Sequence, residues 1–290
     1  MTLPEGRHPA DPVVIGGVGG SGTRVVAKLL REAGVYLGAD LNPALDNLWF
    51  TILFKRPWWY RRAVRSGGAD ILRMLAVFQK LMSGLPLTVS ERGRVTGAAL
   101  QVAVVGHSRR GGGRGAWALR RLSSMLRAGR APQAAGWGFK EPNTHVYLDQ
   151  LARHFPTMRY VHVIRNGLEI ATSGNQGQFL TWRSTFGLSL PKDHRDLPGA
   201  ALEFWAKANR RALALGSERL GDRFLLVRYE GLSREPEKEV RRLLEFAQPA
   251  GGADAGRLAA LVRPSGRSGG RHHPAWLSED HRAWLSELGY

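Results

Sequence analysis

The sequence contains no cysteine among its 290 residues. That absence excludes disulfide bonds, zinc sites built on thiolates and cysteine nucleophiles. The chain also has no run of 18 apolar residues, so it predicts no membrane-spanning helix. Residues 1–12 lack the apolar core of a secretion signal, and we therefore expect a cytoplasmic protein.

Acidic residues are scarce. The chain has 24 Asp and Glu against 42 Lys and Arg, a formal net charge of +18, and arginine far outnumbers lysine. So large a positive charge favours anionic partners such as nucleotides, acidic substrates or lipid headgroups. The usual nucleic-acid-binding motifs are absent, so no specific nucleic acid is expected. The nine histidines have no zinc-site spacing, so no metal is expected either.

Glycine, by contrast, gathers near the start of the chain. Residues 16–22 (GGVGGSG) follow a β-branched run at 13–15 and precede a helical pattern of apolar residues over 23–33. The order strand, glycine loop, helix lets backbone N–H groups and a helix N-terminus face a bound anion. Two hydroxyls and a cation join this candidate phosphate cradle, from Ser21, Thr23 and Arg24. The alternative is a tight strand-to-helix turn without a ligand.

The loop lacks the lysine of the Walker A pattern, Gly-x-x-x-x-Gly-Lys-Ser/Thr. Gly17 and Gly22 have the glycine spacing, but Thr23 occupies the lysine position. The loop is therefore P-loop-like without the residue that an ATPase needs. A phosphoryl-transfer enzyme with a degenerate P-loop is one alternative function.

Four short apolar runs, near residues 13, 137, 160 and 224, are each followed by a helical pattern. This alternation predicts an α/β fold, with a P-loop-like parallel sheet flanked by helices on both faces. We expect a single domain over residues 1–290, with helical and loop insertions at about 48–135 and 176–200 as acceptor-side elements. The second insertion has mixed polarity and no sustained period, which predicts a long surface excursion.

Polar side chains follow these runs at the edge where parallel strands end together. Lys140 ends the second run, and Arg165 ends the third, with Ser173 eight residues further on. An arginine and a hydroxyl so placed can clamp one phosphate. Asp40 and Asp46 lie in the polar loop after the first helix, which should return over the same edge; helix capping is their alternative role.

In order and spacing these segments resemble those of the PAPS-dependent sulfotransferases, most closely a bacterial branch that is also similar to the tyrosylprotein sulfotransferases. The matching segments are GVGGSGTR at 17–24, GFKEP at 138–142, Phe155-Pro156, YVHVIRNGLEIATS at 160–173 and RYEGL at 228–232. The resemblance spans residues 13 to about 270 and is thin in the two insertions.

This resemblance implies transfer of a sulfuryl group from PAPS (3′-phosphoadenylyl sulfate) to an acceptor hydroxyl or amine, with PAP as the product and no metal. The glycine loop would hold the 5′-phosphosulfate, and Arg165 with Ser173 the 3′-phosphate. The nucleotide-binding residues implied in this way are Gly19, Gly20, Ser21, Gly22, Thr23, Arg24, Arg165, Ser173, Tyr229, Arg263 and Arg267.

For the chemistry, the resemblance implies three catalytic residues, Asp40, Lys140 and Arg24. Lys140 is similar to a lysine of tyrosylprotein sulfotransferases that supports the transition state. Asp40 falls where their glutamate base lies, with Asp46 as the second choice. Gly20 departs from the family, which commonly has Lys or Arg there to stabilise the leaving group. Arg24 and Lys140 are the candidates to take over that role.

The acceptor is not specified by these motifs. A tryptophan-rich segment at 49–60 and the 176–200 excursion favour an aromatic or amphipathic small molecule. A glycan, a lipid headgroup or a peptide tyrosine is the alternative. The missing loop cation and the high charge also leave open a non-catalytic protein that binds a nucleotide or a polyanion.

Overall fold

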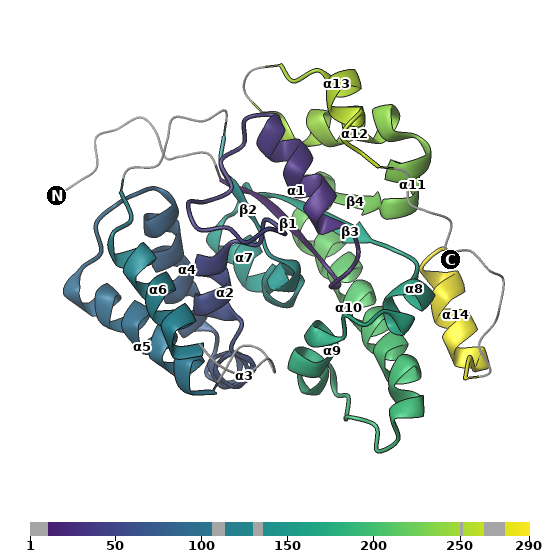
Figure 1. The fold of residues 1–290 in the computed structure, drawn as a ribbon, viewed down its shortest axis with the longest axis horizontal. Helices are drawn as coiled ribbons and strands as arrows, with labels where there is room; N and C mark the ends of the chain where they lie inside the picture. The colour runs from purple at the N-terminus through teal and green to yellow at the C-terminus, as the bar shows by residue number, and fades with distance from the viewer. Residues whose placement is uncertain (1–10, 106–113, 130–135, 250–251, 264–275) are drawn as a thin grey trace.

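The computed structural model describes residues 11–105, 114–129, 136–249, 252–263 and 276–290. Within them the chain forms a four-stranded parallel sheet with strand order β2-β1-β3-β4 (Figure 1). The strands are β1 (Val13–Gly17), β2 (Gly138–Lys140), β3 (Arg159–Ile164) and β4 (Phe224–Arg228). The predicted α/β class and the four predicted strands are confirmed.

The register of the sheet brings three predicted site segments to one edge. Val14 of β1 pairs with Phe139 of β2 on one side and with Tyr160 of β3 on the other. Because the strands are parallel, the glycine loop, Lys140 and Arg165 all follow strands at the same, carboxyl edge.

Helices connect the strands and extend beyond them. In chain order they are α1 (Thr23–Glu32), α2 (Leu48–Phe54), α3 (Pro57–Arg65), α4 (Ala69–Met82), α5 (Val89–Val105), α6 (Arg114–Leu126), η1 (Pro142–Tyr147), α7 (Leu148–His154), α8 (Gly167–Thr172), α9 (Gly177–Trp182), η2 (Arg183–Phe186), η3 (His194–Asp196), α10 (Leu197–Leu220), η4 (Gly221–Arg223), α11 (Tyr229–Arg234), α12 (Pro236–Ala247), α13 (Ala255–Ala259) and α14 (Glu279–Glu287), where η marks a 3-10 helix.

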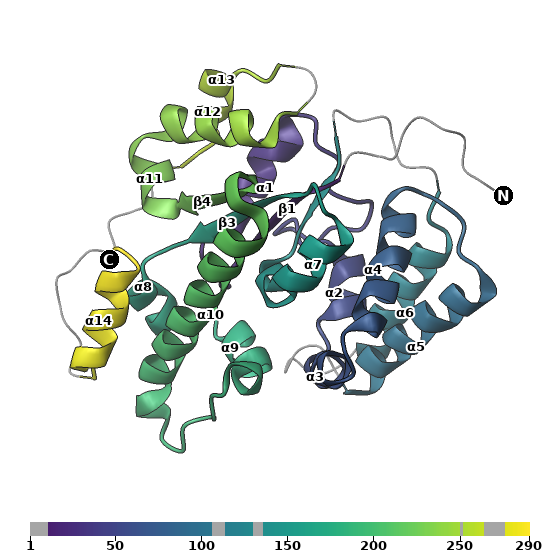
Figure 2. The ribbon, with the colours of Figure 1, turned by 180° about the vertical axis from the view of Figure 1, so that it is seen from behind.

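Helices cover both faces of the sheet, as predicted (Figures 1 and 2). Val14 faces a core built with α2, α4, α7 and α10, whereas Val13 and Ile15 face a second core built with α1, α12 and α13. Successive side chains of a strand point to opposite faces, so burial on both faces requires the continuous apolar run that β1 shows.

The first half of the tryptophan-rich segment at 49–60 forms part of the hydrophobic core. All seven residues of α2 are buried. Phe50 stacks on Phe139 of β2, with 5.2 Å between ring centroids, and meets Phe78 of α4 edge-on at 5.5 Å. Each such ring contributes about 1.5–3 kcal/mol through burial. These rings therefore hold the first insertion against the sheet.

The prediction that residues 176–200 form a surface excursion is wrong for the first half of that range. Residues 177–186 form α9 and η2, and the side chains of Phe179 and Trp182 are buried in the core. A six-residue helix is too short to show a helical period, so mixed polarity hid it. The two aromatic side chains anchor this segment close to the carboxyl edge of the sheet.

No helix in the described ranges is long and apolar enough to cross a membrane.

Candidate active site

The loop between β1 and α1 requires glycine at two positions. Gly20 has φ 96° and Gly22 has φ 92°, in the left-handed region that residues with a Cβ rarely adopt. A Cβ on Gly22 would also lie 2.3 Å from the ring of Tyr229, the first residue of α11. The loop therefore packs directly against the RYEGL segment.

Ser21 places its hydroxyl inside this loop. The side chain is fully buried, and its Oγ has no hydrogen-bond partner within the described residues. A buried hydroxyl left unpaired costs about 1–3 kcal/mol. A bound anion would supply the missing partner. Thr23, also buried, begins α1 immediately after the loop. The residues present thus fit the phosphate group predicted for this loop.

A buried glutamine holds the glycine loop from the other side. Gln178, on α9, accepts a hydrogen bond from the Gly19 N–H at 2.7 Å, across 159 positions of sequence. Its amide nitrogen donates to Oδ1 of Asn143 at 3.0 Å, and the indole N–H of Trp182 donates to the same oxygen at 2.7 Å. The Gly19 N–H, predicted to face the nucleotide, is instead bound to the protein.

Through Asn143, this chain of hydrogen bonds reaches the buried carboxyl group of Glu141, the residue that follows Lys140. Asn143 donates its backbone N–H and its side-chain amide to the two oxygens of Glu141, at 2.7 and 2.8 Å. Burial raises the pKa of the Glu141 carboxyl. The glycine loop is therefore linked by side chains to the segment that carries Lys140. We call this set the Gln178 network: Gly19, Gln178, Trp182, Asn143 and Glu141.

Lys140 is buried at the end of β2 and is paired with one of the two predicted bases. Its ammonium forms an ion pair with Asp46 and donates to the carbonyl of Ala44 at 3.0 Å. The Lys140 side chain is 3% exposed and the Asp46 side chain 20%, so the carboxylate is the more accessible partner. The backbone supports the pair, because the Asn47 N–H donates to the Lys140 carbonyl at 2.7 Å.

Asp40, ranked first as the base, has a different partner. Its Oδ2 lies 2.7 Å from Nε of Arg121 on α6, and both side chains are mostly buried. The Asp40 carbonyl also accepts a hydrogen bond from the N–H of Leu48, at the start of α2. The two carboxylates of this loop are thus separated, and Asp46 is the one that contacts Lys140.

Arg165 reaches the glycine loop from the end of β3. Its guanidinium lies over the ring of Tyr229, 4.7 Å from the centroid, and donates to the Gly20 carbonyl at 3.4 Å. It is also paired with Glu169, one turn along α8, through Nε at 2.7 Å. The Arg165 carbonyl accepts from the indole of Trp205 at 3.1 Å. The structure thus brings together three predicted residues: Gly20, Arg165 and Tyr229.

Ser173 lies at the far end of α8 from Arg165. Its hydroxyl donates to the Ile170 carbonyl at 2.9 Å. The Ile170 side chain in turn faces the loop, since a Cβ on Gly20 would be 3.0 Å from its Cδ1. Within the described residues no hydrogen bond joins Ser173 to Arg165, so α8 alone relates the two side chains.

The remaining predicted residues lie apart from these contacts. Arg24 is exposed in the first turn of α1, and among the described residues it has no ion-pair partner. Arg263 is exposed after α13, which packs on α12, and no hydrogen bond brings it to the glycine loop within the described ranges. Arg267 lies outside the described residues. In the described part of the chain no cluster of three or more His, Asp or Glu could hold a metal ion.

A model of the sulfotransferase family matches residues 12–249. The chain belongs to the sulfotransferase family. The match begins just before β1 and ends after α12, so it contains the glycine loop, Lys140, Arg165 and Tyr229.

One curated relative of this sulfotransferase-family protein is distant in sequence. A protein of Aquifex aeolicus described as uncharacterized is 27% identical over 117 residues, which cover 38% of this chain and 13% of that protein. The chain thus spans about an eighth of the length of that curated relative.

Two solved structures are similar to this one. The sulfotransferase domain from the olefin synthase of Synechococcus is 18% identical, with a TM-score of 0.45 and coverage of 100% of this chain and 98% of that one. A sulfotransferase from Mycobacterium tuberculosis is 16% identical, with a TM-score of 0.43 and coverage of 87% and 71%.

No motif or period in the sequence pointed to the Gln178 network. Gln178 and Trp182 fall in the short helix that mixed polarity hid, and their contacts reach residues far away along the chain. Asn143 carried a signal only as a candidate cap, with Thr144, for a helix beginning near His145; in the structure Glu141 is the cap and accepts from the Asn143 N–H. That signal pointed to a helix start and not to a side chain that supports the site.

Proposed function

We propose that this family member is a PAPS-dependent sulfotransferase that acts on a hydroxyl or an amine of an aromatic or amphipathic acceptor, a small molecule or a glycan. The observation that best supports this proposal is the buried, unpartnered hydroxyl of Ser21. It lies in a left-handed glycine loop that packs against Tyr229, over which the cation of Arg165 is held.

PAPS, when bound, supplies the sulfuryl group. On this proposal Ser21, Thr23 and the N–H groups of Gly20 and Gly22 hold the 5′-phosphosulfate at the N-terminus of α1. Arg24 adds its charge from the exposed first turn of that helix. The commitment of the Gly19 N–H to Gln178 leaves Gly19 a role in the shape of the loop.

Arg165 and Ser173 bind the 3′-phosphate. Arg165 is pre-positioned by the ring of Tyr229 below it, so little side-chain freedom is lost when it binds a phosphate. Its present partner Glu169 shares the guanidinium with the ligand or releases it. The family resemblance also assigns Arg263 and Arg267 to nucleotide binding.

A carboxylate of the 40–47 loop takes the proton of the acceptor hydroxyl. Asp46 is favoured over Asp40 because it contacts Lys140, whereas Asp40 is held by Arg121. Lys140 stabilises negative charge that develops at the reacting centre. No side chain at Gly20 can help, and its φ of 96° disfavours a lysine or arginine there. Lys140, with Arg24, is therefore the cation that replaces the loop lysine of the family.

The same proposal assigns residues 1–290 to one domain of a cytoplasmic protein, with residues 48–135 and 176–200 on the acceptor side. It requires no metal.

The test is turnover. The protein is incubated with PAPS and a panel of phenols, steroids, sugars and amines, while PAP formation and a sulfated acceptor are followed by mass spectrometry. We expect PAP to form only with an acceptor, and Lys140→Ala to abolish it. Transfer from ATP with Mg²⁺, and none from PAPS, would contradict the proposal.

A further inference from the structure

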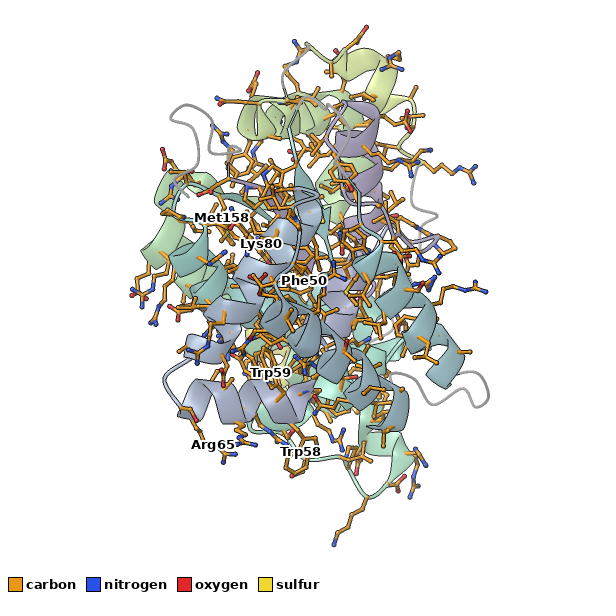
Figure 3. All side chains as sticks on the ribbon, turned by 90° about the vertical axis from the view of Figure 1, so that its left-hand side faces the viewer. Phe50, Trp58, Trp59, Arg65, Lys80 and Met158 are labelled. Carbon is orange, nitrogen blue, oxygen red and sulfur yellow. The ribbon has the colours of Figure 1, made fainter. Side chains whose placement is uncertain are left out.

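Helix α3 presents an aromatic and cationic surface to solvent. Trp58, Arg61, Arg62 and Arg65 share one side of the helix, at positions i, i+3, i+4 and i+7. Tyr60 and Ala63 are buried on the opposite side. We call the four residues the α3 outer face. The Trp58 side chain is 71% exposed. Figure 3 shows α3 along the lower edge of the molecule, with Trp58 and Arg65 projecting away from it.

Among the described residues, no carboxylate pairs with this surface. Residues 47–69 hold five cations, Lys55, Arg56 and the three arginines of the α3 outer face, and no Asp or Glu. Across the described ranges none of the three arginines forms an ion pair. Arg61 donates to the hydroxyl of Ser184 at 2.7 Å, and its guanidinium lies 4.5 Å from the ring centroid of Trp58. The charge of the face is therefore available to an external anion.

The helix that carries this face is firmly held from behind. The Tyr60 hydroxyl donates to the Val146 carbonyl at 3.0 Å, and its ring meets those of Tyr147 and Trp182 edge-on, at 4.8 and 5.7 Å. Arg56 lies over the ring of Trp59 at 4.2 Å. The helix backbone is therefore ordered before a partner binds, and only the exposed side chains of the face lose freedom on binding.

The chemistry of the face fits a lipid–water interface. Tryptophan prefers the headgroup level of a bilayer, and arginine pairs with lipid phosphates there. Val64, 42% exposed, adds apolar surface next to the arginines. A single-stranded nucleic acid would instead need a groove lined with several stacking rings. Here one indole projects from a convex helix.

We propose that the α3 outer face docks this protein on membranes rich in anionic phospholipid. The face lies close to the candidate active site, because Tyr60 packs against Trp182, whose indole belongs to the Gln178 network. This proposal goes beyond the proposed sulfotransferase function and does not depend on it.

The test is sedimentation of the full chain with phosphatidylcholine vesicles, alone and mixed with phosphatidylglycerol. We expect binding to the mixed vesicles only. The double variant Arg62→Glu/Arg65→Glu should weaken it at least about 20-fold, because each cation near an anionic surface contributes about fivefold. Trp58→Ser should weaken it about fivefold and leave PAP affinity unchanged.

A matched control separates this face from the overall charge. Arg120→Glu/Arg127→Glu changes two exposed arginines, one on α6 and one just after its last residue, and alters the net charge by the same amount. It should bind the mixed vesicles with no more than about twofold loss. If both double variants lost the same affinity for the mixed vesicles, net charge alone would explain the binding and the proposal would be overturned. So would tighter binding to a single-stranded oligonucleotide than to vesicles, or no vesicle binding at all.

Discussion

At the scale of single residues, the ion pair between Lys140 and Asp46 decides which carboxylate serves as the base. Asp46→Asn should leave PAP affinity within about twofold and lower kcat by about 10²–10⁴, the usual contribution of a general base. Titration with PAP and turnover of PAPS with a working acceptor measure the two effects.

Asp40→Asn is the comparison for that variant. It leaves the mostly buried Arg121 without a carboxylate, so we expect a lower melting temperature with most of the turnover retained. If Asp40→Asn lost turnover while Asp46→Asn stayed active, the base would be Asp40, the residue predicted first from the sequence.

Gln178 supports the site at the same scale. Gln178→Leu removes the acceptor of the Gly19 N–H and one donor to Asn143, and each unpaired buried group costs about 1–3 kcal/mol. We expect PAP to bind about tenfold more weakly. Thr181→Ala, in the same helix but bonded only to its own backbone, is the control and should bind normally. Equal PAP affinity in both variants would remove Gln178 from the nucleotide site.

At the scale of elements, the glycine loop is defined by its backbone and by the ring it touches. Gly22→Ala should lower stability by more than 2 kcal/mol and abolish PAP binding, because its Cβ would overlap the Tyr229 ring. Gly67 has a similar φ of 82° with nothing near a Cβ. Gly67→Ala should therefore cost only the backbone strain, about 1 kcal/mol, and retain binding. Urea unfolding and PAP titration of both variants test this, and normal binding by Gly22→Ala would contradict it.

The elements that the sequence predicted are those with local signals. A β-branched run before a glycine-rich turn marks β1, and the apolar run before Arg165 marks β3, so the sheet edge and its polar groups could be predicted. The short helix α9 could not, because six residues show no period and its anchors, Phe179 and Trp182, are defined by distant partners.

The sequence also could not show which side chains contact one another at the site. That Asp40 and Asp46 share a loop is visible in the sequence, but the cation that each one meets is on a different element. The same holds for Tyr229, whose position under Arg165 depends on the packing of β4 beside β3.

At the scale of the whole molecule, two buried histidines between the sheet and α10 make stability depend on pH. Burial lowers the pKa of His162 to about 4 and the pKa of His145 well below its usual value. In the unfolded chain both take up protons near pH 6.5, so below that pH the unfolded state binds more protons and stability falls. For His162 the loss at pH 5 is about 2 kcal/mol, and it is complete below about pH 4.

Urea unfolding at about pH 7.5 and pH 5 measures this effect. His162→Gln should lose less free energy of unfolding between the two pH values than the parent, by about 2 kcal/mol. His194→Gln, at an exposed histidine, should behave as the parent does. An unchanged pH dependence in His162→Gln would show that His162 is not the group responsible.

We propose that the glycine loop, Arg165 and Ser173 together form a site for a nucleotide with a 3′-phosphate. The most direct test of this proposal is a calorimetric titration of the full chain with PAP, 5′-AMP and ATP with Mg²⁺, repeated with Arg165→Ala. We expect PAP to bind at least about 100-fold more tightly than 5′-AMP, and Arg165→Ala to remove most of that difference, because a charge-assisted pair to the 3′-phosphate is lost. Equal affinity for PAP and 5′-AMP, or a preference for ATP with Mg²⁺, would contradict the proposal.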